Sequence, residues 1–243
     1  MVEPIQDDLV APCLSVVMAA YNEAATILAA VRAVLDQPVV LELIIVDDGS
    51  RDGTWEALQV LRAEAPRVRL IRHDCNRGKG AALRTGFGHA MAPIVIVQDA
   101  DLEYDPADYR VVLKPILAGK ADVVFGSRFL GSEARRVLYF WHALGNRVLT
   151  TLSNMATNLN LSDMETCYKA FKLEVLRKIT IQEDRFGFEP EVTAKVSRLG
   201  VRIYEVAISY DGRTYADGKK IDWRDGISAL RCIVRYGLFC RRP

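Results

Sequence analysis

The sequence predicts an α/β fold in which a mostly parallel sheet is flanked by helices. Two observations lead to this prediction: short apolar runs alternate with segments of helical periodicity through the first half of the chain, and each run ends at polar residues. The chain has 243 residues, half of them apolar, which is enough for one large core. Because no internal repeat or Ser/Gly-rich linker divides it, we expect a single domain.

Five short apolar runs are the predicted strands. The first is bounded by Pro12 and Asn22, and the second stops abruptly at Asp47, as buried strands do when a loop follows. The remaining runs are four or five residues long, and polar residues follow them as well. The predicted strands are 14–19, 43–46, 68–72, 94–97 and 122–125.

The segments between these strands carry apolar residues at helical spacing, as Ile27, Val31 and Val34 do in the first of them. The predicted helices are 24–37, 54–65, 80–91 and 106–118. After Arg128 the alternation stops. A mixed stretch covers 137–161, a loop covers 162–167, and helical spacing returns over 191–199.

The cysteines and the N-terminus point to a reducing compartment. The five cysteines are scattered without a Cys-x-x-Cys spacing, which fits neither a zinc site nor a disulfide framework. The first 12 residues lack the basic and apolar regions of a secretory signal, and no apolar run approaches the ~20 residues of a spanning helix. The expected location is the cytoplasm.

The charge is distributed unevenly. Residues 1–110 hold 10 Lys or Arg and 17 Asp or Glu, whereas residues 211–243 hold 8 and 4. A basic C-terminal part suits an anionic partner, which charge alone leaves open between nucleic acid, phosphate groups and a membrane surface.

The segment Asp99-Ala100-Asp101-Leu102-Glu103 follows the fourth predicted strand. Three carboxylates at a strand exit are hard oxygen ligands suited to Mg²⁺ or Mn²⁺, through which a diphosphate can be held. An isolated Asp-x-Asp is also common as a solvated acidic turn, here before Pro106. The motif gains weight because three other strand ends carry polar groups as well.

Those three strand ends are Tyr21-Asn22-Glu23, Asp47-Asp48-Gly49-Ser50 and Gly126-Ser127-Arg128. In open α/β sheets, ligands bind beyond the carboxyl ends of the strands. Glu23 and Asp48 are acceptor-only groups that suit the donors of a nucleobase or a ribose. Capping of the next helix is the alternative for Asp47 and Asp48.

The loop Asn76-Arg77-Gly78-Lys79-Gly80 invites comparison with phosphate-binding motifs. It lacks the earlier glycine and the Ser or Thr of a P-loop, and Leu83 stands where the dinucleotide fingerprint has its third glycine. It predicts a basic, glycine-lined helix start at which backbone N–H groups and Lys79 can meet an anion. A plain helix N-terminus is the alternative.

Taken together and in this order, these segments resemble the family 2 glycosyltransferases of GT-A fold, and among them the polyprenyl-phosphate (dolichol-phosphate) mannosyl- and glucosyltransferases. The resemblance covers about residues 14–220. It implies a Rossmann-like sheet, a metal ion (Mg²⁺ or Mn²⁺), and inverting transfer of a hexose from GDP-mannose or UDP-glucose to a polyprenyl phosphate. Nucleic acid is not among the partners it implies, and it makes no prediction of oligomeric state.

The resemblance also implies roles for individual residues. Asp101 and Glu103 would hold the metal, and Asp99 would touch the donor. Two departures matter: Ala20 stands where relatives often have Pro, and Glu103 stands where Gln is frequent, which adds negative charge for the metal. The expected donor-binding residues are Ala20, Tyr21, Glu23, Asp47, Asp48, Lys79, Asp99, Ala100, Arg213 and Lys219.

Arg128 and Arg147 resemble arginines that bind the acceptor phosphate, and Arg213 with Lys219 resembles a basic loop that closes over the donor diphosphate. For Arg147 an ordinary surface position on a predicted helix at 141–152 is the alternative. A hydroxyl acceptor would need a base, for which Asp163, Glu165 and Glu189 are candidates, whereas a phosphate acceptor is already ionised. The expected catalytic residues are Asp99, Asp101, Arg128, Asp163, Glu189 and Arg213.

These expectations divide the chain into an N-terminal extension (1–12), a catalytic domain (13–222) and a basic amphipathic helix (223–243). The catalytic domain has a nucleotide-sugar half (13–128) and an acceptor half (129–222). The C-terminal helix suits a position on the cytoplasmic face of a membrane, but packing on the core explains its pattern equally well. A glycan or small-molecule hydroxyl acceptor remains an alternative. So does a non-catalytic interaction protein, against which the carboxylates at 99–103 argue.

Overall fold

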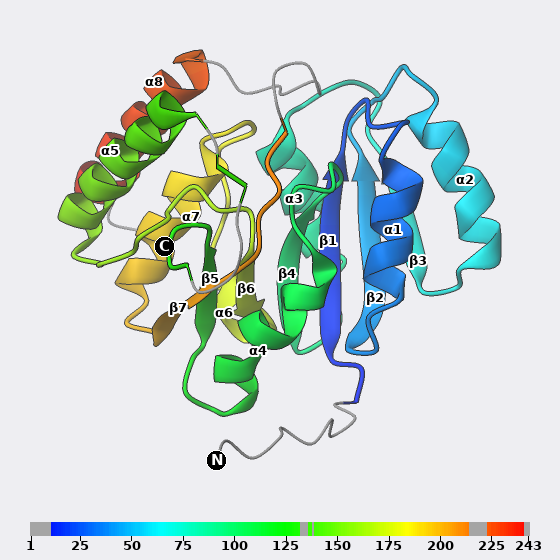
Figure 1. Cartoon of the computed structure of the whole chain (residues 1–243), viewed down its shortest axis with the longest axis horizontal. Helices are drawn as coiled ribbons and strands as arrows, with labels where there is room; N and C mark the ends of the chain where they lie inside the picture. Colours follow the sequence, from blue (N-terminus) through cyan, green and yellow to red (C-terminus); the bar gives the residue numbers. More distant parts are fainter. Residues whose placement is uncertain (1–10, 132–135, 138, 214–222, 241–243) are drawn as a thin grey trace.

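The computed structural model describes residues 11–131, 136, 137, 139–213 and 223–240, with only the backbone of residues 223 and 224. Its strands form one sheet in the order β3-β2-β1-β4-β6-β5-β7 (Figure 1). The strands are β1 (Leu14–Ala20), β2 (Val40–Asp47), β3 (Val68–Arg72), β4 (Ile94–Asp99), β5 (Val123–Ser127), β6 (Lys169–Lys172) and β7 (Ile203–Ala207).

The sheet is mostly parallel, as the alternation of elements predicts. β1 lies between β2 and β4 and pairs with both in parallel, and β5 pairs in parallel with β7. Only β6, among the described strands, runs antiparallel to its neighbours β4 and β5. The second half of the chain therefore returns into the sheet of the first half, which makes one domain.

The five predicted strands are confirmed, with ends that differ by at most three residues. The strands β6 and β7 were not predicted. β6 has four residues with a lysine at each end, and β7 is a partly exposed edge strand, so neither forms an apolar run. Their place in the sheet is determined by tertiary pairing rather than by local pattern.

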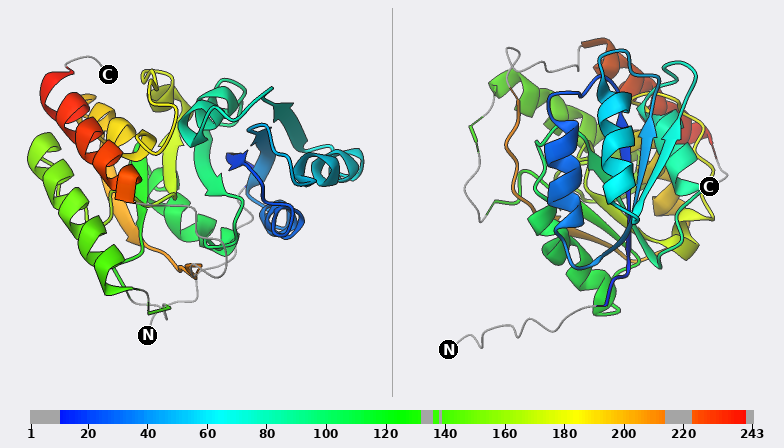
Figure 2. Two further views of the ribbon diagram at one scale, coloured as in Figure 1. Left: turned by 90° about the horizontal axis from the view of Figure 1, so that it is seen from above. Right: turned by 90° about the vertical axis from the view of Figure 1, so that its right-hand side faces the viewer.

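The helices cover both faces of the sheet. α1 and α4 lie on one face, and α3 and α7 lie on the other (Figures 1 and 2). α5, α7 and α8 pack against one another at the end of the sheet opposite β3. The helices are α1 (Ile27–Leu35), α2 (Thr54–Glu64), α3 (Lys79–Phe87), α4 (Tyr109–Leu117), α5 (Phe140–Thr157), α6 (Leu173–Leu176), α7 (Phe188–Arg198) and α8 (Trp223–Val234), with a 3₁₀ turn at Pro106–Asp108.

The predicted C-terminal helix is α8, and a π-helical turn extends it over Arg235–Phe239. Its inner side packs on α7 through Cys232 and Tyr236, which are buried. Its outer side exposes apolar residues. Packing on the core is therefore confirmed for the inner side, and a position on a membrane surface stays a prediction. No helix within the described residues is long and apolar enough to cross a membrane.

Candidate active site

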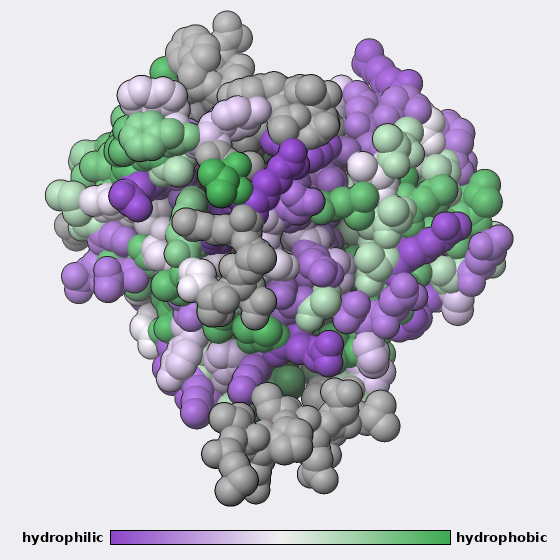
Figure 3. Space-filling model, viewed as in Figure 1, coloured by the Kyte–Doolittle hydropathy of each residue, from purple (hydrophilic) through white to green (hydrophobic). Residues whose placement is uncertain are grey.

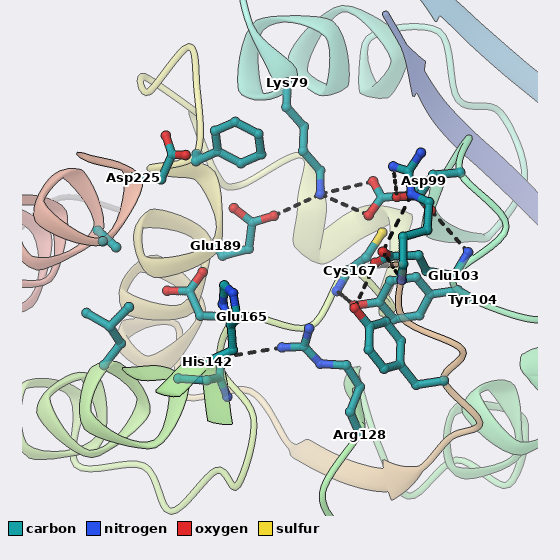
Figure 4. Close-up of a pocket in the computed structure, with 18 of the residues that line it drawn as sticks. Lys79, Asp99, Glu103, Tyr104, Arg128, His142, Glu165, Cys167, Glu189 and Asp225 are labelled. Carbon is teal, nitrogen blue, oxygen red and sulfur yellow. Dashed lines mark hydrogen bonds and ion pairs between the residues drawn. The ribbon is translucent and has the colours of Figure 1, made fainter. Parts of the chain in front are cut away.

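A cavity of about 1540 Å³ opens at the carboxyl ends of β1, β2, β4 and β5. Most of the residues predicted from the strand ends line it, together with side chains from α5, α7 and the 162–167 loop. Figure 4 shows Lys79 and Asp99 on one side of this space and Arg128 on another. The predicted residues that line the cavity are Ala20, Tyr21, Glu23, Asp48, Lys79, Asp99, Ala100, Asp101, Glu103, Arg128, Arg147, Glu189 and Arg213.

Asp99 ends β4 and forms an ion pair with Lys79, the first residue of α3. The ammonium nitrogen lies 3.0 Å from Asp99 Oδ1 and 3.1 Å from Oε1 of Glu189 on α7. Burial opposes the charged form of each group. The Lys79 ammonium nevertheless holds the pKa of Asp99 below its usual value, and the two carboxylates raise the pKa of Lys79. The charged Lys79 therefore forms ion pairs with both the end of β4 and the start of α7.

Asp101 and Glu103 share one cation, the Arg213 guanidinium. Arg213 Nη2 lies 2.8 Å from Asp101 Oδ2, and the Arg213 amide donates to Glu103 Oε1 at 2.8 Å. The same guanidinium approaches Glu23 Oε2 at 3.4 Å. Burial and the charges of Asp99 and Glu103 still raise the pKa of Asp101 to about 7, against the lowering effect of Arg213. Negative charge around Asp101 is therefore incompletely balanced.

This arrangement fits a divalent cation. Within the described residues no three His, Cys, Asp or Glu side chains form a metal site by themselves. Arg213, however, occupies the place between Asp101 and Glu103 as a stand-in cation. Mg²⁺ is ordinarily bound by one or two carboxylates, with substrate phosphates and waters completing the coordination. Two carboxylates that already converge on one cation meet that requirement.

Asp48 organises the loop before α3. Its carboxylate accepts hydrogen bonds from the amides of Arg77 and Gly78, at 3.0 and 2.7 Å, and is hydrogen-bonded to Nδ1 of His73 at 2.7 Å. The prediction of a free anion site at this helix start is therefore wrong in part. The amides of Arg77 and Gly78 donate to the Asp48 carboxylate, and the amide of Ala81 donates to the Asp184 carbonyl.

The glycines of this loop are required by close packing. A Cβ atom at Gly78 or Gly80 would collide with the carbonyls of Asp184 and Glu183, and Gly78 has a φ of +103°. The loop 183–185 therefore lies directly against the start of α3. This contact places Lys79 beside α7.

Asp47 differs from the other strand-end residues. It is fully buried and does not line the cavity, its Oδ2 lies 3.2 Å from Arg72 Nε, and its Oδ1 accepts from the Ser50 amide. The geometry therefore excludes Asp47 from direct contact with a ligand in this cavity. It does not cap α2 either: Asp52 accepts from the Thr54 amide at the start of that helix.

Arg128, just after β5, is fixed by Asp163. Arg128 Nε and Nη2 donate to the two oxygens of Asp163 at 2.6 and 2.8 Å, and Asn146 donates to Asp163 at 3.1 Å. Asp163 is fully buried outside the cavity lining, and Arg128 lowers its pKa against the effect of burial. These contacts correct the prediction that Asp163 is a base candidate: it orients Arg128.

Arg147 on α5 lines the cavity and is exposed. Within the described residues its guanidinium makes no ion pair, which leaves it available to an anion. Lys219, the other predicted basic residue, lies outside the described residues.

The sequence did not predict the contacts of Tyr210 and Glu165, which lie between the residues around Asp101 and those around Arg128. Tyr210, just after β7, donates to Glu103 Oε2 at 2.7 Å, and its ring lies 5.1 Å from the Arg128 guanidinium. Glu165 was considered only as a base. It lines the cavity, and burial together with the neighbouring Glu189 raises its pKa to about 8. A single Glu or Tyr in an irregular segment has no sequence pattern that would predict such contacts.

Comparisons with known proteins agree with this geometry. The family model described as glycosyl transferase family 2 matches residues 15–180. A dolichyl-phosphate beta-glucosyltransferase of Trichomonas vaginalis is 28% identical, with 94% of this chain and 74% of that protein covered. An undecaprenyl-phosphate mannosyltransferase of Micrococcus luteus is 26% identical, with 91% and 92% covered.

A solved structure supports the fold. Glucosyl-3-phosphoglycerate synthase from Mycobacterium tuberculosis, in complex with Mn²⁺, UDP and phosphoglyceric acid, superposes with a TM-score of 0.71 at 21% identity, covering 94% of this chain and 80% of that one. At this identity the likeness shows the fold alone, which is the predicted GT-A arrangement. The family match extends over more than half of the chain. The chain therefore belongs to the family 2 glycosyl transferases.

Proposed function

We propose that this glycosyltransferase moves a hexose from a nucleoside-diphosphate sugar (GDP-mannose or UDP-glucose) to a polyprenyl-phosphate lipid, with inversion at the anomeric carbon. The observation that carries the proposal is the convergence of Asp101 and Glu103 on one cation in the same cavity as Arg128 and Arg147. In this assignment residues 13–128 form the nucleotide-sugar half and residues 129–222 the acceptor half.

On the donor side, Ala20, Tyr21, Glu23 and Asp48 line the part of the cavity beyond β1 and β2, where a nucleoside fits. Asp101 and Glu103 would hold Mg²⁺ or Mn²⁺, and the metal would supply positive charge to the leaving diphosphate. With a metal on these carboxylates, the Arg213 guanidinium would be released from them and could donate two bonds to the diphosphate.

On the acceptor side, Arg128 is held rigidly by Asp163, and Arg147 reaches the cavity from α5. Two guanidinium groups suit a phosphate. A phosphate oxygen is already ionised at neutral pH, so the attack on the anomeric carbon needs no base. The named relatives that act on polyprenyl phosphates support this choice of acceptor.

A lipid acceptor requires contact with a membrane, and α5 and α8 present a surface for it. Both helices expose large apolar side chains, among them Trp141 and Phe239, each 76% exposed. Apolar residues gather on this side of the molecule in Figure 3. The exposed arginines Arg231 and Arg235 lie on α8 and its extension, and both share the single carboxylate of Glu183, so the group keeps a net positive charge. This combination fits peripheral binding to an anionic membrane surface.

The test is a transfer assay with radiolabelled GDP-mannose and UDP-glucose, Mn²⁺ and short-chain polyprenyl phosphate, followed by organic extraction. We expect label in the lipid fraction with wild type and not with Asp101→Asn. Label in a water-soluble glycan instead would favour the alternative of a hydroxyl acceptor. Glu165 and Glu189 are the candidate bases for that reaction. No transfer from either donor to any acceptor would contradict the proposal.

A further inference from the structure

Two carboxyl groups on the cavity wall have oxygens that no internal contact uses. Within the described residues, Oε1 of Glu165 and Oε2 of Glu189 are buried and accept no hydrogen bond. Glu189 is 4% exposed, and its other oxygen accepts from Lys79. A buried carboxylate oxygen without a donor is costly, and on a cavity wall a ligand that brings donors can satisfy it.

The position of the pair limits what that ligand is. Both residues line the cavity; Glu189 points toward Lys79, and Glu165 lies next to Glu189 on the side nearer Arg128 (Figure 4). Lys79 contacts Asp99 on the proposed donor side, and Arg128 belongs to the proposed acceptor side. The group that passes from donor to acceptor must lie between these two sides. The pair therefore lies beside the transferred group rather than beside either phosphate.

The charge of the pair points the same way. Glu165, with its pKa raised to about 8, is largely neutral, and Glu189 is already paired with Lys79, so the pair offers no positive charge to a phosphate. A hexose ring is neutral and carries several hydroxyl donors. Burial, and after it the charge of Glu189, raise the pKa of Glu165, while buried Lys169 opposes that rise. Lys169 itself bonds to the Thr166 carbonyl and does not neutralise either carboxyl group by direct contact.

We propose that Glu165 and Glu189 form the subsite for the hydroxyl groups of the transferred hexose and so determine which sugar the enzyme accepts. This inference rests on the proposed function and adds the residues that select the sugar. Hydroxyl groups at different ring positions would donate to Glu165 Oε1 and Glu189 Oε2. An epimer that points one hydroxyl away leaves an acceptor unpaired, which is how polar sites reject analogues.

The test separates binding of the sugar from binding of the nucleotide. Calorimetric titrations with Mn²⁺ compare UDP, UDP-glucose and UDP-galactose, and likewise GDP, GDP-mannose and GDP-glucose. The proteins are wild type, Glu165→Ala, Glu165→Gln and Glu189→Gln, with the exposed Glu174→Gln as the matched control. Glu165→Ala and Glu165→Gln are the main variants because Glu165 has no ion pair among the described residues to disturb.

We expect Glu165→Ala to bind the nucleoside diphosphate within about twofold of wild type and the matching nucleotide sugar roughly tenfold more weakly. It should also lose most of the discrimination between epimers, which a purely structural defect would not do. Glu165→Gln and Glu189→Gln retain an acceptor oxygen, so their affinities for the nucleotide sugar should lie between those of wild type and Glu165→Ala. Glu174→Gln should bind every nucleotide with the affinity of wild type.

Three results would overturn the subsite. Unchanged binding of nucleotide sugars by every variant would remove it, and an equal loss for the nucleoside diphosphate would show a general disturbance instead. Glu→Gln variants that bind the nucleotide sugar normally in the titrations but give no product in the transfer assay described above would show a base. If wild type binds none of the six nucleotides, the proposed function fails first, and the subsite with it.

Discussion

The two sides of the cavity handle charge in opposite ways. On the donor side, carboxylates at the end of β4 share the cations Lys79 and Arg213, and the pKa of Asp101 is still raised to about 7. On the acceptor side, Arg128 is locked by Asp163, and Arg147 has no ionic partner among the described residues. One side suits a cation and the other suits an anion, as the proposed metal-bound donor and phosphate acceptor require.

The largest expected effect is a loss of stability when the ion pair between Arg128 and Asp163 is removed. Arg128→Ala leaves the buried Asp163 carboxylate without its ionic partner, which should cost about 3–5 kcal/mol in the free energy of unfolding. Urea denaturation measures it. Arg147→Ala is the matched control, because this arginine is exposed and its loss should change stability by no more than about 0.5 kcal/mol. Equal losses of stability in the two variants would contradict the view that Arg128 is fixed by Asp163 and Arg147 is not.

The next prediction concerns the carboxyl pair between the two sides. The pKa of Glu165 in the folded protein, about 8, lies above its ordinary value because of burial and of Glu189 and Asp163, against the opposing effects of Lys169 and Arg128. The folded state therefore binds more protons than the unfolded state, and this contribution to stability is lost as pH rises towards 8.

In Glu165→Gln that loss should disappear, so the fall in unfolding free energy between pH 5 and pH 8 should be smaller by on the order of 2 kcal/mol. Urea denaturation at both pH values measures the difference. A parallel pH dependence in wild type and variant would show that Glu165 is ionised throughout.

Arg147→Ala should have a moderate effect on activity alone. Because its guanidinium is available to the acceptor, its removal should raise KM for short-chain polyprenyl phosphate roughly tenfold, with a much smaller change in kcat and none in donor KM. Steady-state assays in which each substrate is varied give the three values. A rise in the donor KM would move Arg147 to the donor side.

The smallest effect should come from Tyr210, which touches both sides. Tyr210→Phe removes the hydrogen bond to Glu103 and keeps the ring beside Arg128. We expect about 1 kcal/mol of lost stability. We also expect somewhat weaker binding of Mn²⁺ with nucleotide, since Glu103 loses a bond that orients it. Thermal denaturation and a Mn²⁺ titration check the two parts.

The sequence predicted well which strand-end residues line the cavity, because their signals are local. Each strand is a short apolar run that ends at a polar residue, and parallel strands bring their carboxyl ends to one edge, so Asp48, Asp99 and Glu23 had to meet. Asp47 shows the limit of this reasoning. Adjacent residues on a strand point to opposite faces, and nothing local told which of Asp47 and Asp48 faces the cavity.

The acceptor side was less predictable because its contacts join distant segments. Asp163 binds Arg128 across 35 positions, and Glu103 accepts from Tyr210 across 107. The strands β6 and β7 that create these contacts have no apolar run, so the pairing that positions Glu165 and Tyr210 appears only in the folded chain.

The most direct test of the central claim is the metal-dependent binding of the donor at Asp101. Thermal denaturation of wild type and Asp101→Asn is followed with GDP or UDP, each with and without Mn²⁺. One diphosphate should raise the Tm of wild type by roughly 5–10 °C at about 100 times Kd, only with Mn²⁺, and should leave Asp101→Asn unchanged. Stabilisation that is independent of Mn²⁺ and Asp101, or none by either diphosphate, would contradict the account.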